Sequence, residues 1–348
     1  MVTGSEHAQK LTAPPARAVR RVRICSLATY VPPRLLTNAD LERMVETTDE
    51  WILQRTGIRE RHIVDPGVAT SDLAFEASRA AIEQAGLTPQ DIEFIVVGTT
   101  TPDTIFPSTA CLLQHKLGAT RAWGFDLGAA CSGFTYSLAT AAQFVATGVH
   151  TNVLVVGADV MSSIIDYTDR TTCVLFGDGA GAVVLGPSDA DADGPGIIDF
   201  ACEIDGSGGP ALCMPAGGSR MPASHETVEK RLHYVHQDGQ TVFKFAVRKT
   251  EEICRRLLER NGLTPANLDL LVSHQANRRI IQLASEKLGV DPGRVVINIE
   301  RFGNTTAATI PLALEDARAD GRLKPGDLVM LTSVGAGFTV GALLLRWG

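Results

Sequence analysis

The stretch Gly86-Leu-Thr-Pro-Gln-Asp-Ile-Glu-Phe-Ile-Val-Val97 recurs in altered form as Gly262-Leu-Thr-Pro-Ala-Asn-Leu-Asp-Leu-Leu-Val-Ser273, 176 positions further along a chain of 348 residues. The run Val153-Leu-Val-Val156 matches Val329-Met-Leu-Thr332 at the same offset. Two separate segments that share one offset indicate an internal repeat. We therefore expect two similar halves, residues 21–190 and 195–348, with residues 1–20 as a flexible N-terminal extension.

Each copy of the repeat combines a helical pattern with a short apolar run. In the first half, residues 73–85 have helical periodicity, Gly86 is a helix-stop signal, and residues 92–97 resemble a buried strand. In the second half, residues 247–261 and 268–272 repeat this order. Strands that alternate with helices in this way predict an α/β fold with a mainly parallel sheet in each half.

Composition and charge exclude several classes of protein. The 32 basic and 39 acidic residues give a net charge of −7, which argues against a nucleic-acid-binding protein. The seven cysteines form no C-x-x-C pair, a pattern typical of a reducing compartment rather than of a disulfide framework or zinc ribbon. Residues 127–158 lack Asp, Glu, Lys and Arg, but they are rich in small and polar residues. They predict a buried helix and strand, so we expect a cytoplasmic protein without a membrane partner.

Cys131 is the best candidate nucleophile. It lies in Gly128-Ala-Ala-Cys-Ser-Gly133, where small residues permit a sharp turn from a strand into a helix. A cysteine at the N-terminus of a helix has its thiolate stabilised, which lowers its pKa from about 8.5. An ordinary buried cysteine is an equally good interpretation of this segment alone.

Two further segments carry candidate polar groups. His274 follows the strand predicted at 268–272, and ligands bind at the carboxyl ends of strands in open α/β sheets; the alternative is a hydrogen-bonded loop histidine. Asn304 follows Gly303 at the start of a helical run over 307–317, which it could simply cap. His233-x-x-His236 has too few partners for a metal site, and we expect none.

A glycine-rich loop, Gly335-Ala-Gly-Phe-Thr-Val-Gly341, follows the last apolar strand. It resembles a dinucleotide-binding fingerprint, but that motif requires a following helix and an acidic residue about 20 positions on. Only seven residues follow Gly341, so we expect an oxyanion-binding loop instead. The related Gly177-Asp-Gly-Ala-Gly181 indicates close backbone packing.

Together the motifs closely resemble those of β-ketoacyl-acyl-carrier-protein synthase III, the initiating condensing enzyme of dissociated (type II) fatty-acid synthesis, within the thiolase-like superfamily. The resemblance extends from about Val22 to Trp347. It rests on Thr48-Asp-Glu-Trp-Ile-Leu-Gln-Arg-Thr-Gly-Ile-Arg-Glu-Arg61, Ala130-Cys-Ser-Gly-Phe134, Phe176-Gly-Asp-Gly-Ala-Gly181, His274-Gln-Ala-Asn277, Gly303-Asn-Thr305 and the 335–341 loop. It implies a duplicated, five-layered α-β-α-β-α fold with mostly parallel mixed sheets, a homodimer, and an acyltransferase that needs no cofactor.

The resemblance also implies catalytic roles. Cys131 would take an acyl group from acyl-CoA, and His274 and Asn304 would bind the thioester carbonyl of malonyl-acyl-carrier protein during decarboxylation. The backbone N–H groups of Cys131 and Ala336 would form the oxyanion hole. Many family members have Gly where Ala336 stands here, which makes that donor depend on the backbone conformation that Ala can adopt.

Binding roles follow from the same resemblance. Residues implied in coenzyme A binding are Thr47, Trp51, Arg55, Arg170 and Asn277; those implied in carrier-protein binding are Lys244, Gln275, Arg279 and Lys287. Phe106 would cross a dimer interface to close the acyl pocket. From the residues alone, Trp51 could equally be a core aromatic, and Thr47-x-x-Glu50 could be a capping box. Glu286 stands where some relatives have a basic residue, which would reduce the carrier-protein surface.

Residue types separate this chain from neighbouring families. Thiolases use a second cysteine near the C-terminus, but none follows Cys254, and elongating synthases have a second histidine where Asn304 stands. Two alternatives remain open. One is a related acyltransferase or condensing enzyme of secondary metabolism with the same three residues, and the other is a non-catalytic partner subunit.

Overall fold

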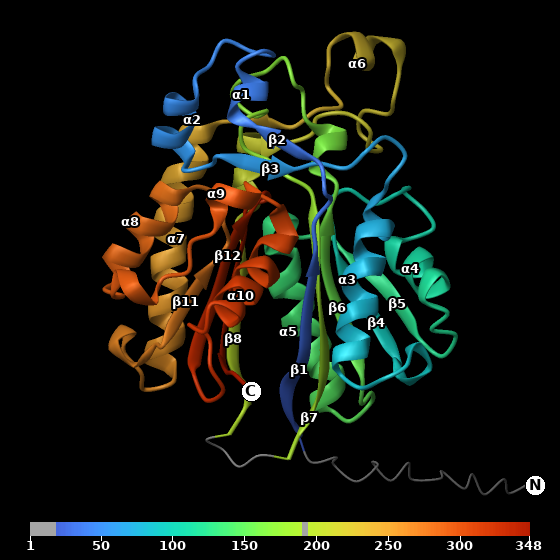
Figure 1. The fold of residues 1–348 in the computed structure, drawn as a ribbon, viewed down its shortest axis with the longest axis vertical. Coiled ribbons are helices and arrows are strands. Elements are labelled where there is room, and N and C mark those ends of the chain that lie inside the picture. The colour runs from blue at the N-terminus through green and yellow to red at the C-terminus, as the bar shows by residue number, and fades with distance from the viewer. Residues whose placement is uncertain (1–18, 190–193) are drawn as a thin grey trace, which may run out of the picture.

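Two large sheets lie side by side in the computed structural model, which describes residues 19–189 and 194–348 (Figure 1). Most of the extension expected at residues 1–20 lies outside this range. The first sheet has the order β1 (Arg21–Tyr30), β7 (Gly179–Ser188), β6 (Val153–Asp159), β4 (Phe94–Gly98), β5 (Trp123–Leu127). The second has the order β11 (Leu270–Ser273), β12 (Leu328–Gly335), β13 (Thr339–Arg346), β8 (Gly196–Ile204). Each sheet thus takes its strands from one part of the chain.

Both sheets are mixed. Parallel pairing joins β4 to β5 and β6, and β11 to β12. All pairings of β1, β7, β8 and β13 are antiparallel. The expectation of mostly parallel sheets is therefore wrong in this detail. Consecutive strands run parallel only when a long crossover connects them, usually a helix, whereas β12 and β13 are joined by a tight hairpin that reverses the chain.

Helices complete five layers. The outer face of the first sheet packs against α3 (Thr70–Gln84) and α4 (Thr109–Leu117), and that of the second against α7 (Gly239–Arg260) and α8 (Arg278–Leu288). Between the sheets lie α5 (Gly133–Ala146) and α10 (Thr309–Ala319) (Figure 1). This confirms the five-layered thiolase-like fold. The predicted helix at 247–261 begins earlier, at Gly239, where Asp238 accepts hydrogen bonds from the backbone N–H groups of Gln240 and Thr241.

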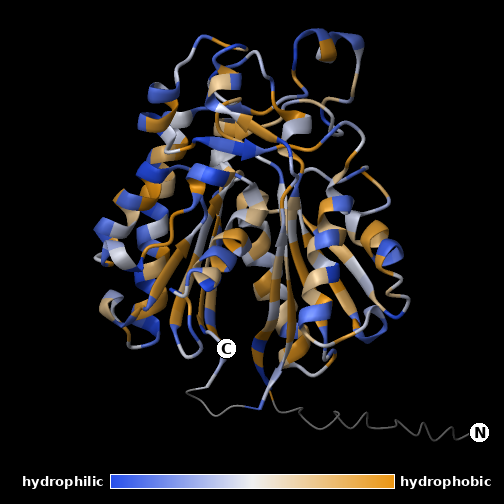
Figure 2. Cartoon of the chain, viewed as in Figure 1, coloured by the Kyte–Doolittle hydropathy of each residue, from blue (hydrophilic) through white to orange (hydrophobic). Residues whose placement is uncertain are grey.

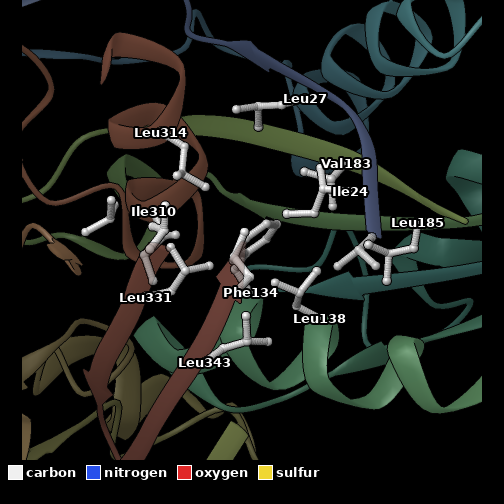
Figure 3. Close-up of a cluster of buried hydrophobic side chains, with 14 of the residues drawn as sticks. Ile24, Leu27, Phe134, Leu138, Val183, Leu185, Ile310, Leu314, Leu331 and Leu343 are labelled. Atoms are coloured by element: carbon white, nitrogen blue, oxygen red, sulfur yellow. The ribbon is translucent and has the colours of Figure 1, made fainter. Parts of the chain in front are cut away.

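The central layer explains the charge-free run at 127–158. Side chains of α5 and α10 meet those of both sheets in one apolar cluster, which includes Phe134, Leu138, Ile310, Leu314, Ile24, Leu27, Val183, Leu185, Leu331 and Leu343 (Figure 3). Burying each such leucine or phenylalanine contributes about 1.5–3 kcal/mol. Of the two central helices, α5 carries no charged residue, and α10 carries its charged residues only in its last turns, at Glu315, Asp316 and Arg318. The outer helices carry hydrophilic residues outward (Figure 2). No helix in the described ranges is long and apolar enough to cross a membrane.

Short elements cover the upper end of both sheets in Figure 1. They are β2 (Leu35–Thr37), β3 (Glu60–His62), α1 (Asn38–Leu41), α2 (Asp49–Thr56), β9 (Leu212–Cys213), β10 (His236–Gln237), α6 (His225–Glu229) and α9 (Ile299–Phe302). The fully buried Arg61 of β3 connects part of this layer, because its guanidinium donates to Asn38 Oδ1 in α1 at 2.8 Å and to the Val174 carbonyl at 2.7 Å. This end of the sheets contains the carboxyl ends of the parallel strands.

Candidate active site

One cavity of about 430 Å³ brings Cys131, His274 and Asn304 together. Residues of α2, α7 and the start of α8 also line it, so both halves and the covering elements contribute walls. Trp51, Arg55 and Arg170 belong to the same lining. The three candidate catalytic residues, which are far apart in the sequence, therefore face a shared space.

Cys131 lies in a strained turn between a strand and a helix. After β5 the chain forms a 3₁₀ turn, Ala130–Ser132, and then enters α5. Ala130 has a φ of +47°, in the left-handed region that non-glycine residues rarely adopt. A side chain at Gly98 would lie 2.6 Å from the backbone of Gly133, so the small residues permit the close approach of β4 to α5. This is the sharp turn that the motif predicts.

The expected lowering of the Cys131 pKa is wrong. Burial raises the pKa of this thiol to about 12, and the nearby carboxylate of Asp159 acts in the same direction. Removal of the thiolate from water outweighs the hydrogen bond from the Cys131 backbone N–H, which lowers the pKa. Cys131 is therefore held as a neutral thiol in the chain alone.

His274 lies directly after β11 and is buried. Its backbone N–H donates to the Thr332 carbonyl at 2.8 Å, and its ring Nδ1 lies 2.7 Å from Thr309 Oγ1. Burial lowers the pKa of the imidazole to about 3. The ring is consequently neutral at pH 7 and can accept or donate one hydrogen bond toward the cavity that it lines.

Asn304 is fixed at both its backbone and its side chain. Its N–H donates to the Leu175 carbonyl, and its carbonyl accepts from the N–H of Gly177. Its Oδ1 accepts from the N–H of Thr306 at 2.9 Å. This turn precedes a 3₁₀ segment, Thr306–Ala308, and α10 begins only at Thr309 without a side-chain cap. Asn304 therefore caps the 3₁₀ segment and not α10 itself, and its amide NH₂ group remains available to the cavity that it lines.

The hairpin between β12 and β13 lies against the backbone of Cys131. A side chain at Gly335 would come within 2.8 Å of the Cys131 nitrogen and 2.9 Å of the Ala129 carbonyl oxygen. Ala336 lines a second cavity, of about 160 Å³, together with Cys131 and Thr306. The remaining walls of that cavity are largely apolar and include Met161, Ile164, Phe176, Leu212, Met214 and Val235.

The opening of the larger cavity is an aromatic and cationic cleft. The guanidinium carbons of Arg170 and Arg55 lie 5.0 and 5.9 Å from the centre of the Trp51 ring. Asn277 Nδ2 donates to the Arg55 carbonyl at 2.9 Å. Trp51 is half-buried, so it is not a fully enclosed core residue.

Thr47 does not line this cavity, and its buried hydroxyl has no hydrogen-bond partner in the described part of the chain. The capping-box interpretation of Thr47 is wrong, because Thr48 is the residue that caps α2.

Of the four residues expected to bind a carrier protein, three are exposed. Lys244 lies on α7, and Arg279 and Lys287 lie on α8. Gln275 is only 1% exposed, and its amide bonds to the carbonyls of Ser273 and Val296 and to the N–H of Asn298. A buried amide with these partners cannot reach a protein docked outside, so its expected role is wrong.

Phe106 lies outside both cavities of its own chain. It follows Ile105 on the loop after β4, and the two side chains are 84% and 85% exposed. Neither lines the cavities next to Cys131. Its expected role in an acyl pocket thus depends on a second copy of the chain.

Sequence reasoning missed Asp159. Its carboxylate is completely buried, and it accepts hydrogen bonds from Thr99, Thr100, Thr101 and Thr306. A signal was available, because Asp159 is the first charged residue after the charge-free run 127–158. A charge that ends a buried strand requires such partners.

Family comparisons agree with this architecture. Residues 125–206 match the family described as 3-oxoacyl-[acyl-carrier-protein] synthase III, and residues 258–347 match its C-terminal part. Among solved structures, that of 3-oxoacyl-[acyl-carrier-protein] synthase III from Aquifex aeolicus VF5 superposes with a TM-score of 0.86. It is 42% identical, and the match covers 94% of this chain and 100% of that one.

Two relatives that match over almost their whole length are more similar to this chain in sequence than the Aquifex protein is. The β-ketoacyl-[acyl-carrier-protein] synthase III of Solibacter usitatus is 61% identical over 327 residues, which is 94% of this chain and 99% of the relative. That of Koribacter versatilis is 57% identical over 330 residues, 95% of this chain and 99% of the relative. The chain therefore belongs to the β-ketoacyl-[acyl-carrier-protein] synthase III family of condensing acyltransferases.

Proposed function

We propose that this chain transfers an acyl group from acyl-CoA to Cys131 and then condenses it with malonyl-acyl-carrier protein. The products are 3-oxoacyl-acyl-carrier protein, CoA and CO₂. The observation that carries the proposal is the convergence of Cys131, His274 and Asn304 on one cavity. An acyl acceptor and two neutral polar side chains are the groups that this reaction needs.

In the first step, the sulfur of Cys131 attacks the thioester carbonyl of acyl-CoA. The new C–S bond forms as the bond to the CoA sulfur breaks, and the thiol proton ends on the departing CoA. Because the Cys131 thiol is neutral at rest, its proton must leave during the attack. The N–H groups of Cys131 and Ala336 are the proposed donors to the oxyanion that forms. The approach of Gly335 to the Cys131 nitrogen supports this placement.

In the second step, malonyl-acyl-carrier protein loses CO₂. The electron pair of the broken C–C bond becomes an enolate, whose oxygen the side chains of His274 and Asn304 would hold. Hydrogen-bond donors that are already in place stabilise charge where it develops. The enolate carbon then attacks the carbonyl carbon of the Cys131 thioester, the bond from that carbon to the sulfur breaks, and the released thiolate takes a proton from solvent to restore the resting thiol. No cofactor is needed, because the malonyl carboxylate supplies the electron pair.

Binding roles follow from the same geometry. The Trp51 ring with two guanidinium groups beside it suits a flat, electron-rich base linked to phosphates, as in coenzyme A. Arg55, Arg170 and Asn277 are the proposed neighbours of that nucleotide. Lys244, Arg279 and Lys287 form no salt bridge within residues 19–189 and 194–348, and would bind an acidic carrier protein.

We further propose a homodimer in the cytoplasm. In the described chain β5 is an edge strand, with only β4 as its neighbour, and it exposes half of Trp123. Pairing of this edge with a second copy would cover it. The same association would give the exposed Phe106 a place in the acyl pocket of the partner.

The pathway supported first is fatty-acid synthesis, and secondary metabolism is the second candidate. The priming β-ketosynthase of the R1128 polyketide pathway superposes with a TM-score of 0.87 and is 37% identical over 97% of this chain and 99% of that one. The reaction proposed here would be the same in either pathway.

The test is intact-protein mass spectrometry after incubation with a panel of acyl-CoAs. The wild-type protein should gain the mass of one acyl group, and Cys131→Ala should gain none while it remains folded. Asn304→Ala is the matched control, because it should still be acylated but should not decarboxylate malonyl-acyl-carrier protein. Acylation of Cys131→Ala, or no decarboxylation by the wild type, would refute the proposal.

A further inference from the structure

Thr309 is a buried residue that contacts His274 but not the cavity. Its hydroxyl lies 2.7 Å from the Nδ1 of His274 and 3.1 Å from the Thr306 carbonyl oxygen. Thr309 is the first residue of α10, and a threonine hydroxyl in a helix commonly bonds the carbonyl three residues earlier. The hydroxyl has one hydrogen for two possible acceptors.

The Thr306 carbonyl is itself fixed. Thr306 has a φ of +50°, which is costly for a β-branched residue. Its hydroxyl donates to the buried carboxylate of Asp159, and Asp159 also accepts from the N–H of Ala307. The N–H of Thr306 donates to Asn304 Oδ1. One strained residue thus connects Asn304 on one side with Thr309, and through it His274, on the other.

The position of the Thr309 hydrogen decides which ring nitrogen of His274 is protonated. When Thr309 donates to Thr306, the neutral imidazole must donate from Nδ1, and its Nε2 is then an acceptor. When Thr309 donates to Nδ1, the ring hydrogen is on Nε2, the only nitrogen left to donate to a carbonyl. A neutral ring cannot hold both hydrogens.

We propose that Thr309 is a positioning residue that donates its hydroxyl hydrogen to His274 Nδ1 and so keeps the ring hydrogen on Nε2, with the Thr306 carbonyl as the competing acceptor. This rests on the proposed function, in which His274 donates to the malonyl thioester. Thr309 should affect the decarboxylation step and not the acylation of Cys131, since it touches neither Cys131 nor the second cavity.

The experiment compares Thr309→Val, Thr309→Ala and Thr309→Ser in the full-length protein. Acylation from acyl-CoA is followed by mass spectrometry, and CO₂ release from malonyl-acyl-carrier protein is followed separately. We expect the Val and Ala variants to be acylated within about twofold of wild type, but to decarboxylate about 10–100-fold more slowly, the range known for loss of the hydrogen-bond partner that orients a metal-bound histidine. Thr309→Ser keeps the hydroxyl and should recover most of the rate.

Thr305→Val is the matched control. Thr305 is also fully buried in this segment, but its hydroxyl has no hydrogen-bond partner among the described residues. It should behave as wild type in both assays. The inference is overturned if Thr309→Val and Thr309→Ala decarboxylate at the wild-type rate, or if both half-reactions fall equally. Failure of the wild type to decarboxylate would instead refute the proposed function.

Discussion

The two halves of the molecule differ most where corresponding strands end. The offset of 176 that relates the repeated segments also relates Gly98 to His274 and Asp159 to Gly335. In the first half a glycine ends β4 and a buried carboxylate ends β6. In the second half a histidine follows β11 and a glycine ends β12. The positions correspond, but small and polar residues have exchanged places.

This exchange assigns different tasks to the halves. Gly98 lets α5 approach β4 and so places Cys131, while Asp159 anchors the segment that holds Asn304. On the other side His274 projects into the cavity, and Gly335 lets the hairpin reach the Cys131 backbone. A duplicated scaffold brings four strand ends together, and the side chains there can then diverge without changing either sheet.

Of the substitutions at these corresponding positions, Gly335→Ala should have the largest effect, on the rate of Cys131 acylation. The new methyl group would lie 2.8 Å from the Cys131 nitrogen, which is too close for any fit without displacement of the hairpin. We expect acylation of Cys131 to slow by about 10³-fold, as for loss of an oxyanion donor. Acylation kinetics with thermal unfolding would measure this. Gly206→Ala is the control and should keep the wild-type acylation rate, because its new methyl group meets nothing within 4 Å. A wild-type acylation rate in Gly335→Ala would contradict the role of the loop.

Asp159→Asn changes the corresponding position in the first half and should act mainly on stability. The carboxylate accepts from backbone N–H groups and from threonine hydroxyls. An amide NH₂ group would face some of these donors instead. We expect the free energy of unfolding to fall by about 2–3 kcal/mol, measured by urea denaturation.

Asp65→Asn is the control for that measurement, because Asp65 is exposed and makes only a 3.8 Å ion pair with Arg34. It should change the free energy of unfolding by less than about 0.5 kcal/mol. Equal stability of the two variants would show that the Asp159 contacts contribute little.

The smallest predicted effect is the loss of unfolding free energy in acid. Burial lowers the pKa of His274 to about 3, from 6.5 in the unfolded chain. Above pH 6.5 this histidine leaves the free energy of unfolding at its full value. As the pH falls from 6.5 toward 3, that free energy decreases, because the unfolded state binds the proton and the folded state does not.

His274→Gln lacks this titration. From pH 7 to pH 5 the wild type should lose about 2 kcal/mol more unfolding free energy than the variant, which urea denaturation at the two pH values would measure. If both proteins lose the same amount of unfolding free energy, the folded state binds the proton on His274 as readily as the unfolded state does.

Local sequence predicted much of this molecule. The repeat predicted the α/β architecture, and the charge-free run 127–158 predicted the buried helix and strand. Small residues around Cys131 predicted the strained turn, since that conformation depends on neighbours in the chain. His274 and Asn304 were found for the same reason, as polar residues next to a predicted strand and a glycine turn.

Only the tertiary structure decided properties that depend on residues distant in sequence. Burial raises the pKa of Cys131 and so keeps its thiol neutral, and the packing of the fold encloses the Gln275 side chain. The hairpin after β12 made the second sheet largely antiparallel. Asp159 meets Thr306 only because the two halves close around one layer of helices, and Thr309 meets His274 only because α10 packs beside β11. Desolvation and hydrogen bonding between halves have no local signature, whereas turns and periodicity do.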